Sequence, residues 1–440
     1  MLNRRSAFLT AGAALATAGM SARSYAQIIG ANERVRFAVM GVNGRGVPHM
    51  NAIAALPNTA VSHLIDVDRN ILDQRASEFT ARGGSGFALA HDYRRVIESA
   101  DTDVLTIAAP DHWHARAAID ALAAGKHVYI EKPCSVTPHE GEALVAAQQR
   151  YGRVVQMGNQ QRSSVETKDL MHLIQEGLLG EIYEVDTWYA NSRGSIGVGV
   201  DGPPPPHLDW ELWQGPAPRR AYRSNVVHYN WHWFWRWGTG EICNNALHEL
   251  DLARWALGVT YPEHVSALGQ RRFYQNDDWE MYDTMRLELT FPGGKIARWT
   301  GHSCNNLQRF GRGRGALIMG TNGSALLDRN GYTIFDLRGA KVREVTATAA
   351  SATVDTRGEG VLDLLHLENM IAVMRGQTDQ QASPIAEGHI STMLCHLGNI
   401  AYRTDGALSC DPVTGRPSSR EALRYWRRDY ADGWEIPTTQ

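Results

Sequence analysis

Lys132 and His248 carry side chains that could move a proton to or from a substrate hydroxyl group. Lys132 stands between an apolar run, residues 128–130, and Pro133. An ammonium group at the end of a strand can hydrogen-bond a hydroxyl oxygen and stabilise the alkoxide that forms as the carbon gives up a hydride. A histidine titrates near neutral pH and can accept the proton as a general base. From the residues alone, Lys132 could equally be an exposed strand-end residue, and His248 a buried histidine bonded to a carbonyl group.

Polar and aromatic residues near His248 in the chain could bind a substrate that carries several hydroxyl groups. Asn244 precedes His248 by four positions, so the two side chains share one face of a helix. Glu241 lies in the same stretch and is an alternative acid. The segment 228–233, His-Tyr-Asn-Trp-His-Trp, offers Trp231 and His232 for stacking on a sugar ring, although these side chains could equally serve packing alone.

Histidine and cysteine residues do not form a pattern that is typical of a metal site. His112 and His114, and likewise His228 and His232, lie close in the chain, but no carboxylate or cysteine completes a ligand set. The five cysteines are scattered and never form a Cys-x-x-Cys pair, so we expect neither zinc nor a disulfide framework. The sequence therefore predicts a site without a metal ion.

A glycine-rich turn after the first apolar run predicts a dinucleotide site. Residues 34–40 indicate a strand, residues 47–55 indicate a helix, and the turn between them consists of Gly41, Val42, Asn43, Gly44, Arg45 and Gly46. Glycine lets the backbone approach a pyrophosphate, and the helix N-terminus faces its negative charge. Asn43 takes the place of the second glycine in G-x-G-x-x-G, and asparagine tolerates positive φ better than most residues. A tight structural turn is the alternative interpretation.

Residues at the ends of the next apolar runs extend this prediction. Asp66 lies at the end of the run 61–67, where a carboxylate would bind the adenosine ribose hydroxyls and repel a 2′-phosphate. NAD is therefore expected, although Arg69 leaves NADP open, and Asp66 could instead be a turn residue. Further cofactor contacts are expected from residues that follow later apolar runs, namely Ala109, Pro110, His112, Trp113, His114 and Glu131.

The alternation of apolar runs and helical stretches over residues 34–150 predicts a doubly wound parallel sheet, the Rossmann arrangement. A chain of 440 residues is too long for one ordinary core, so a second domain is expected. We assign residues 31–155 to cofactor binding, residues 156–405 to substrate binding and oligomerisation, and residues 406–440 to a tail that packs on both domains.

The second domain is expected to be an α+β domain with a large, mostly antiparallel sheet. Strands are expected at 182–189, 263–273, 282–291, 295–302, 315–320, 324–328 and 331–337, and helices at 168–176, 361–375 and 388–403. One sheet face would carry helices, and the other would be free for self-association. The glycine- and proline-rich residues 191–222 are expected to form an ordered loop over the site, anchored by Trp210 and Trp213, and residues 343–358 a surface loop.

Residues 1–26 have the pattern of an export signal. Arg4 and Arg5 form a basic start, a weakly apolar stretch follows to about Met20, and Ser-Tyr-Ala at 24–26 fits a cleavage site. The paired arginines favour twin-arginine export to the periplasm, with an ordinary secretory signal or a cytoplasmic protein as alternatives. The stretch is too short to span a bilayer, so no membrane insertion is expected once the signal is removed. Because free nicotinamide nucleotide is scarce outside the cytoplasm, an exported enzyme would have to hold its cofactor tightly.

The composition argues against two classes of protein. Hydrophobic residues make up 43% of the chain and charged residues 21%, which is typical of a globular enzyme. The formal net charge is -3, without long runs of like charge. Neither a nucleic-acid surface nor a membrane-binding patch is therefore expected.

The order of these motifs resembles the glucose–fructose oxidoreductase, inositol dehydrogenase and MocA (Gfo/Idh/MocA) family. The motifs are GVNGRG at 41–46, APDHWH at 109–114, AGKHVYIEKP at 124–133, WGTGE at 237–241, HELDLARWALG at 248–258 and EGHISTMLCHLGNIA at 387–401. The resemblance implies a nicotinamide-dependent activity on a sugar or polyol, and dimers or tetramers formed through the open sheet. It places Lys132 at the reaction centre, with a cis bond before Pro133, and makes His248 the proton acceptor. Asn244 departs from the family's aspartate, and an amide can orient a hydroxyl group but cannot act as a base.

Three functions are compatible with these residues. The first is a sugar or polyol oxidoreductase with a tightly bound nicotinamide cofactor, in which two substrates take turns. The second is a redox-neutral glycosidase, in which transient oxidation of a ring carbon permits elimination of the aglycone. The third is a nucleotide-bound sugar-binding protein without catalysis, which the departure at Asn244 would permit.

Overall fold

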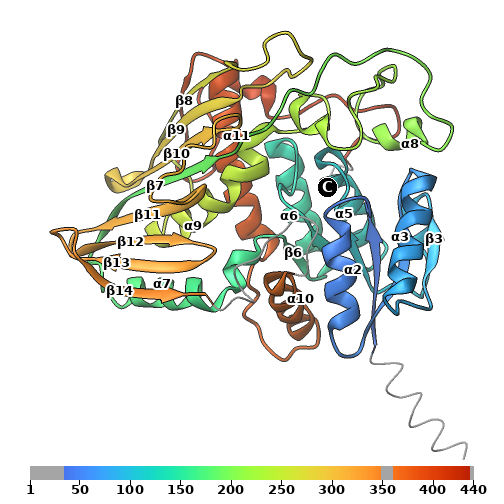
Figure 1. Cartoon of the computed structure of the whole chain (residues 1–440), viewed down its shortest axis with the longest axis horizontal. Coiled ribbons are helices and arrows are strands. Elements are labelled where there is room, and N and C mark those ends of the chain that lie inside the picture. Colours follow the sequence, from blue (N-terminus) through green and yellow to red (C-terminus); the bar gives the residue numbers. More distant parts are fainter. Residues whose placement is uncertain (1–33, 348–359, 437–440) are drawn as a thin grey trace, which may run out of the picture.

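The computed structural model describes residues 34–347 and 360–436, so the predicted export signal at residues 1–26 lies outside the described residues. Within the described ranges the chain forms two sheets, one of six strands and one of nine. Figure 1 shows the nine-stranded sheet on the left and the domain of the six-stranded sheet on the right. Helices α9 (Leu247–Leu257) and α11 (Ile385–Arg403) lie between the two.

The first sheet confirms the predicted Rossmann arrangement. Its parallel strands have the order β3-β2-β1-β4-β5-β6. They are β1 (Val35–Met40), β2 (Thr59–Ile65), β3 (Ala88–Ala90), β4 (Val104–Ile107), β5 (His127–Ile130) and β6 (Val155–Met157). The connecting helices are α2 (Gly46–Ala55), α3 (Arg69–Ala81), α4 (Tyr93–Ile97), α5 (His114–Ala123) and α6 (Pro138–Tyr151). The chain reverses its direction of travel across the sheet at β1, and ligands bind at such a switch point, beyond the carboxyl ends of the strands.

Three parts of this domain differ from the prediction. Strand β3 lies at the sheet edge, is mostly exposed and has only three residues, so it is too short for the sequence pattern to reveal it. Strand β6 pairs with β5, although all but its first residue lie beyond the predicted boundary at residue 155. Helix α10 (Val361–Met374), from late in the chain, adds Leu367, Met370 and Ile371 to the core of the first sheet. The first domain is therefore completed by residues from outside 31–155.

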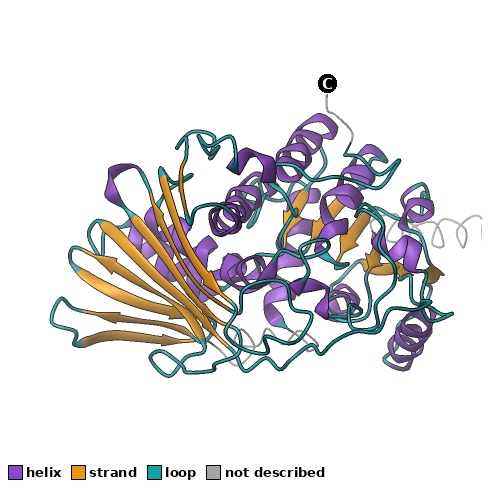
Figure 2. Cartoon of the chain, turned by 90° about the horizontal axis from the view of Figure 1, so that it is seen from above, coloured by secondary structure: helices purple, strands orange, loops and turns teal. Residues whose placement is uncertain are grey.

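The second sheet is mostly antiparallel, as predicted, and has the order β14-β13-β12-β11-β7-β10-β9-β8-β15. Its strands are β7 (Ile182–Ala190), β8 (His264–Gln270), β9 (Thr284–Thr290), β10 (Ile296–His302), β11 (Arg314–Gly320), β12 (Gly323–Asp328), β13 (Gly331–Phe335), β14 (Lys341–Thr346) and β15 (Ala407–Ser409). Strands β7 and β10 run parallel, and the other neighbours run antiparallel. Helices α7 (Val165–Gln175), α9 and α11 cover one face, as Figure 2 shows from above.

The two edges of this sheet contain strands that were not predicted. Strand β14 includes residues 343–346, which were expected to lie in a surface loop; residues 348–359 lie outside the described residues. Strand β15 comes from the predicted tail and pairs with β8. On the face without helices, Arg298 forms ion pairs with Glu184 and Glu288. Self-association through this face remains a prediction.

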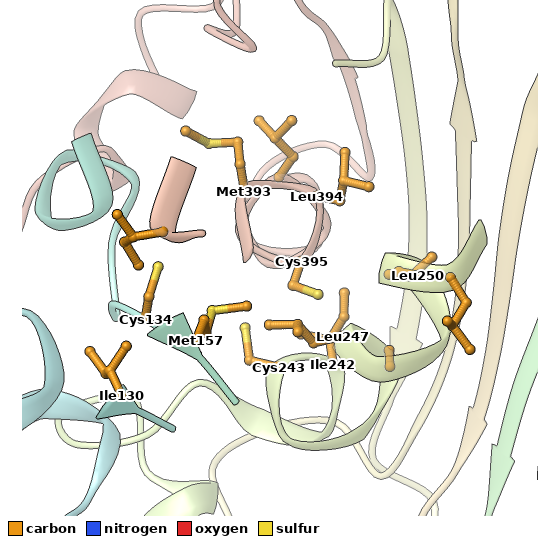
Figure 3. Close-up of a cluster of buried hydrophobic side chains, with 14 of the residues drawn as sticks. Ile130, Cys134, Met157, Ile242, Cys243, Leu247, Leu250, Met393, Leu394 and Cys395 are labelled. Carbon is orange, nitrogen blue, oxygen red and sulfur yellow. The ribbon is translucent and has the colours of Figure 1, made fainter. Parts of the chain in front are cut away.

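An apolar core joins the two domains beneath the site. Figure 3 shows Ile130 of β5 and Met157 of β6 in one cluster with Ile242 and Leu247, and with side chains of α11. Because this cluster is fully buried, it fixes β5, which ends two residues before Lys132, against the helix that carries His248. All five cysteines have free thiols, as their scatter predicted.

The described part of the chain contains neither a helix that could span a membrane nor a cluster of potential metal ligands. Within residues 34–347 and 360–436, no helix is both long and apolar enough to cross a membrane. The same residues contain no group of three or more His, Cys, Asp or Glu side chains placed to hold a metal ion.

Candidate active site

A cavity of about 590 Å³ opens at the carboxyl ends of the parallel strands and is bounded by both domains. Most of the predicted site residues line it: Gly41, Asn43, Gly44, Arg45, Asp66, Ala109, Pro110, Trp113, His114, Glu131, Lys132, Trp231, His232, Asn244 and His248. Four predicted residues do not line it, namely Gly46, Arg69, His112 and Glu241. The glycine turn and His248, which lie about 200 residues apart in the sequence, therefore line the same cavity.

The glycines of the turn have different physical roles. Gly41 has φ +85°, and a Cβ atom there would lie 2.6 Å from the backbone nitrogen of Ala109, so this position requires glycine. A Cβ atom on Gly46 would collide with the carbonyl oxygen of Gly41. Glycine at this position therefore lets α2 begin directly beside Gly41. A Cβ atom on Gly44 would meet nothing within 4 Å, because this residue faces the cavity. Asn43 has no positive φ, so the reason that we gave for asparagine at this position does not apply.

This turn fits the pyrophosphate of a dinucleotide. The open backbone at Gly44 lies at the N-terminus of α2, where unpaired N–H groups favour an anion. Asp66 accepts a hydrogen bond from the Val42 nitrogen at 3.0 Å and another from the Asp68 nitrogen at 3.1 Å. Its carboxylate therefore ties the end of β2 to the turn and remains on the cavity wall. Arg69, in contrast, is exposed at the start of α3 and does not line the cavity.

Residues 112–114 support the wall of the cavity through hydrogen bonds to backbone carbonyl oxygens. His112 is buried, and its Nε2 lies 2.9 Å from the carbonyl oxygen of Trp213, to which Trp113 Nε1 also donates. The ring nitrogens of His114 contact the carbonyl oxygens of Ala109 and Pro133, at 2.7 and 2.5 Å. His114 thus fixes the peptide that follows Pro133, while His112 holds the loop at Trp213.

Glu131 is held as a carboxylate directly before Lys132. It accepts hydrogen bonds from Arg45 Nε at 2.8 Å, His49 Nε2 at 2.9 Å and Gln160 Nε2 at 2.9 Å. Burial alone would raise the pKa of Glu131, but Arg45 and His49 hold it well below the ordinary value. Arg45 also pairs with Asp363 of α10, which the sequence did not reveal.

Lys132 lies at the junction of the two domains. The bond to Pro133 is cis, as the family resemblance implied. Lys132 Nζ donates to the carbonyl oxygen of Asn244 at 2.6 Å and to its Oδ1 at 3.3 Å. Burial lowers the pKa of Lys132 from its ordinary value, and the charges of Arg314 and Arg45 add to this effect. An ammonium group has three donors, so one remains for a ligand in the cavity.

His248 faces the same cavity as a neutral imidazole. Asn244 belongs to a π-helical turn (Ile242–Ala246) that leads directly into α9, where His248 is the second residue. Burial lowers the pKa of His248 well below its ordinary value, and the nearby charges of Lys132, Arg329 and Arg314 lower it further. In the part of the chain that the structure describes, no group hydrogen-bonds its ring, which can therefore accept a proton from a ligand.

Glu241 is not available as the alternative acid. Its carboxylate binds Arg193 Nε at 2.8 Å and Ser303 Oγ at 2.8 Å, and it also accepts a hydrogen bond from Asn245. Burial opposes ionisation, but these partners hold the pKa of Glu241 below its ordinary value. Its role is to neutralise Arg193 beneath the cavity, a pairing that separation in the sequence conceals.

The aromatic segment lies over the cavity. The rings of Trp231 and His232 are stacked at 3.6 Å between centroids, and His232 Nδ1 lies 2.6 Å from the carbonyl oxygen of Tyr229. Burial lowers the pKa of His232 to about 3, so this ring is neutral and offers a flat surface to a ligand. The fold also brings in residues that were not predicted, namely Tyr189, Arg193, Arg314 and Arg329, all from the second sheet and the loop that follows β7.

The fold and this cavity define a two-domain, nicotinamide-dependent oxidoreductase. Residues 35–159 match the family model described as "Oxidoreductase family, NAD-binding Rossmann fold", and residues 213–326 match the "GFO/IDH/MocA C-terminal domain". The chain belongs to the Gfo/Idh/MocA family, and its first domain is an NAD-binding domain.

Curated relatives are similar over different extents. The "Uncharacterized oxidoreductase YrbE" of Bacillus subtilis (strain 168) is 22% identical over 303 residues, which are 68% of this chain and 75% of that protein. The "Glycosyl hydrolase family 109 protein 1" of Shewanella sp. (strain ANA-3) is 26% identical over 161 residues. That match spans 36% of this chain and only 35% of the relative.

Two crystal structures show the same fold. The WlbA dehydrogenase from Bordetella pertussis, in complex with NADH and UDP-GlcNAcA, has 19% identity and a TM-score of 0.65, covering 86% of this chain and 98% of its own. The aldose-aldose oxidoreductase from Caulobacter crescentus, complexed with glycerol, has 18% identity and a TM-score of 0.64, covering 86% and 99%. The fold of both domains is therefore shared with these proteins.

Proposed function

We propose that the protein oxidises a carbinol carbon of a sugar or polyol. The observation that carries this proposal is that Lys132, Asn244 and His248 line the same cavity as the glycine turn and Asp66. When bound, the nicotinamide accepts the hydride that the carbinol carbon gives up. The sugar-binding and aldose-converting proteins among the similar structures support this substrate class.

The roles of the side chains follow from their charges. The free N–H of Lys132 donates to the substrate hydroxyl oxygen and stabilises the alkoxide as it forms. His248, held neutral by burial and by three nearby cations, accepts the hydroxyl proton. Asn244 fixes the Lys132 ammonium group, and its amide can also orient a second substrate hydroxyl. In the reverse direction, His248 returns the proton and Lys132 polarises the carbonyl group.

Substitution of Lys132 tests this function. The variant Lys132→Met should lower kcat by about 10²- to 10⁴-fold, because the developing alkoxide loses its donor. Absorbance at 340 nm with a panel of sugars and polyols measures the loss, and absorbance at 260 nm after denaturation checks that nucleotide is still bound.

Lys126→Met is the matched control, since Lys126 flanks the same strand, β5, at its other end and donates to the Ser99 carbonyl oxygen outside the cavity. It should leave turnover unchanged. Full activity of Lys132→Met would contradict the proposed role of Lys132. A wild-type protein that binds sugars but shows no change in absorbance at 340 nm would favour a non-catalytic binding protein.

We also propose that the cofactor stays bound between turnovers. The loop between β7 and α9 crosses the end of β2, where Asp66 lies: Arg69 N donates to the His207 carbonyl oxygen at 2.9 Å, and Asp209 N to that of Val67 at 3.0 Å. His228 Nε2 donates to the buried Asp68 carboxylate at 2.9 Å. A loop fixed in this way slows nucleotide release, so one substrate must be oxidised before the next is reduced. Ping-pong kinetics and nucleotide in the purified protein would support this proposal; rapid exchange of added NAD would contradict it.

A redox-neutral glycosidase is the second candidate, because relatives named as glycosyl hydrolases match a third of this chain. In that reaction the same Lys132 and His248 would oxidise a ring carbon and later restore it. Cleavage of aryl glycosides without net NADH accumulation would identify this activity, whereas NADH formation without cleavage would support the oxidoreductase.

We also propose that the protein is exported to the periplasm and forms a homo-oligomer. The paired Arg4 and Arg5 support twin-arginine export of a folded, cofactor-loaded protein to the periplasm. The face of the nine-stranded sheet that carries no helices offers a surface for a homodimer or homotetramer. Cell fractionation and light scattering test these two points.

A further inference from the structure

Arg329 differs from the other arginines that line the cavity. It lies in the turn between β12 and β13, at the rim of the second sheet. Arg45 pairs with Glu131 and Asp363, Arg193 with Glu241, and Arg314 with Glu249. In the described residues no carboxylate or other acceptor binds the Arg329 guanidinium. The adjacent carboxylate of Asp328 is already bound by Arg312 Nη1 at 2.9 Å.

The second-domain wall of the cavity has an excess of positive charge. Its described lining residues include no aspartate or glutamate, and Arg193 and Arg314 are neutralised from behind. The carboxylates that do line the cavity, Asp66, Asp92, Asp111 and Glu131, all come from the first domain. The half-buried guanidinium of Arg329 faces the cavity without a protein partner, so this wall is complementary to an anion rather than to a neutral sugar.

Arg329 and the proton acceptor both belong to the second-domain wall of the cavity, whereas the glycine turn belongs to the first-domain wall. Its charge is among those that lower the pKa of His248, and its own pKa is lowered to about 9 by burial and by neighbouring Arg314. The pyrophosphate of the cofactor is expected at Gly44 and the start of α2, on the first-domain wall. The anion that Arg329 faces is therefore part of the molecule whose carbinol reaches His248.

We propose that the substrate is a sugar or polyol bearing an oxyanion, either a carboxylate or a phosphate ester, and that Arg329 binds it. This inference rests on the proposed function and names its substrate class. The planar guanidinium can donate two parallel hydrogen bonds to either oxyanion. Arg329 thereby determines specificity and orients the carbinol toward His248 and Lys132.

The test compares matched ligands on the nucleotide-loaded protein. Binding of neutral aldoses, the corresponding uronic acids and the 6-phosphates is measured by calorimetry, and turnover by absorbance at 340 nm. The wild-type protein should bind one anionic series at least 10-fold more tightly than its neutral counterpart, and the two anionic series distinguish a carboxylate from a phosphate.

The variant Arg329→Gln should weaken binding of the anion by roughly 10- to 100-fold and leave neutral sugars unaffected, with partial recovery in Arg329→Lys. Arg309→Gln is the matched control, because Arg309 pairs with Asp186 on the same sheet outside the cavity lining. Equal binding of neutral and anionic ligands by the wild type, an equal loss of both in Arg329→Gln, or loss of bound nucleotide in that variant would each overturn the inference. If neutral sugars turn over as well as anionic ones, this inference fails while the proposed function stands; if anions bind through Arg329 but nothing is oxidised, the proposed function fails instead.

Discussion

The two walls of the cavity are built in different ways. The first-domain wall comes from one stretch of chain, residues 40–132, and its key positions are glycines whose missing side chains leave room for a ligand. The second-domain wall comes from distant segments, and its key positions are long charged side chains, most of them neutralised by a buried partner. The cofactor side of the cavity therefore depends on local backbone geometry, whereas the substrate side depends on tertiary ion pairs.

The largest effect is expected from breaking a buried ion pair behind the second wall. Arg162 Nε and Nη2 donate to the carboxylate of Asp251 at 2.7 and 2.8 Å, and Ser391 Oγ donates to it at 2.6 Å. Asp251 lies three residues after His248 on α9 and is 2% exposed. The variant Arg162→Met should lower the free energy of unfolding by about 3–5 kcal/mol at pH 7, because it leaves a buried carboxylate without its cation.

This destabilisation should depend on pH. Burial acts against the ionised form of Asp251, but Arg162 holds its pKa below the ordinary value in the folded state. Such a carboxylate stabilises the fold above its unfolded pKa, and the contribution disappears as the pH falls. The difference between the variant and the wild type should therefore shrink in acid, as urea unfolding at several pH values can measure. Arg309→Met, which removes a partly exposed pair, should cost less than about 1 kcal/mol and serves as the control.

The next effect concerns the glycines of the first wall. Gly46→Ala should cost about 1–3 kcal/mol, since its Cβ would collide with the carbonyl oxygen of Gly41. Gly44→Ala should leave the melting temperature unchanged but reduce bound nucleotide, because its Cβ would project into the cavity. Thermal unfolding and nucleotide content of both variants separate the two roles. Equal behaviour of the pair would mean that the turn is structural only.

These differences explain which parts of the site the sequence could predict. The glycine turn, Asp66 and Lys132 each follow a buried strand, so local apolar runs and spacing locate them. Arg314 and Arg329 have no such signal, because only the pairing of β11, β12 and β13 brings their positions to the cavity.

The errors in the prediction have the same physical origin. Glu241 is close to His248 in the sequence, but Arg193 removes it from the site through a contact across 48 residues. Strands β3 and β14 are largely exposed edge strands, and without one buried face they show no alternation of apolar residues. Sequence patterns record burial, so they miss elements and ion pairs that burial alone does not specify.

The smallest effect is expected at Asn244, the position where the family resemblance implies an aspartate. In Asn244→Asp, a carboxylate would replace the amide whose Oδ1 lies 3.3 Å from Lys132 Nζ. A negative charge there should raise the pKa of Lys132, and also that of His248 one helical turn further on, because both cationic forms gain a partner. His248 must be neutral to accept the proton, so the acidic limb of kcat/KM should move to higher pH, and Lys132 should move the basic limb in the same direction.

The maximum rate of Asn244→Asp should change by less than about tenfold, since neither proton-transferring group is removed. Profiles of kcat/KM against pH measure the shift, with the exposed Asn306→Asp as a control for the same change of charge far from the cavity. A profile that keeps both limbs in place would show that the rate does not depend on these two groups. In that case the charges of the second-domain wall would not affect the reaction, because they act on it only through Lys132 and His248.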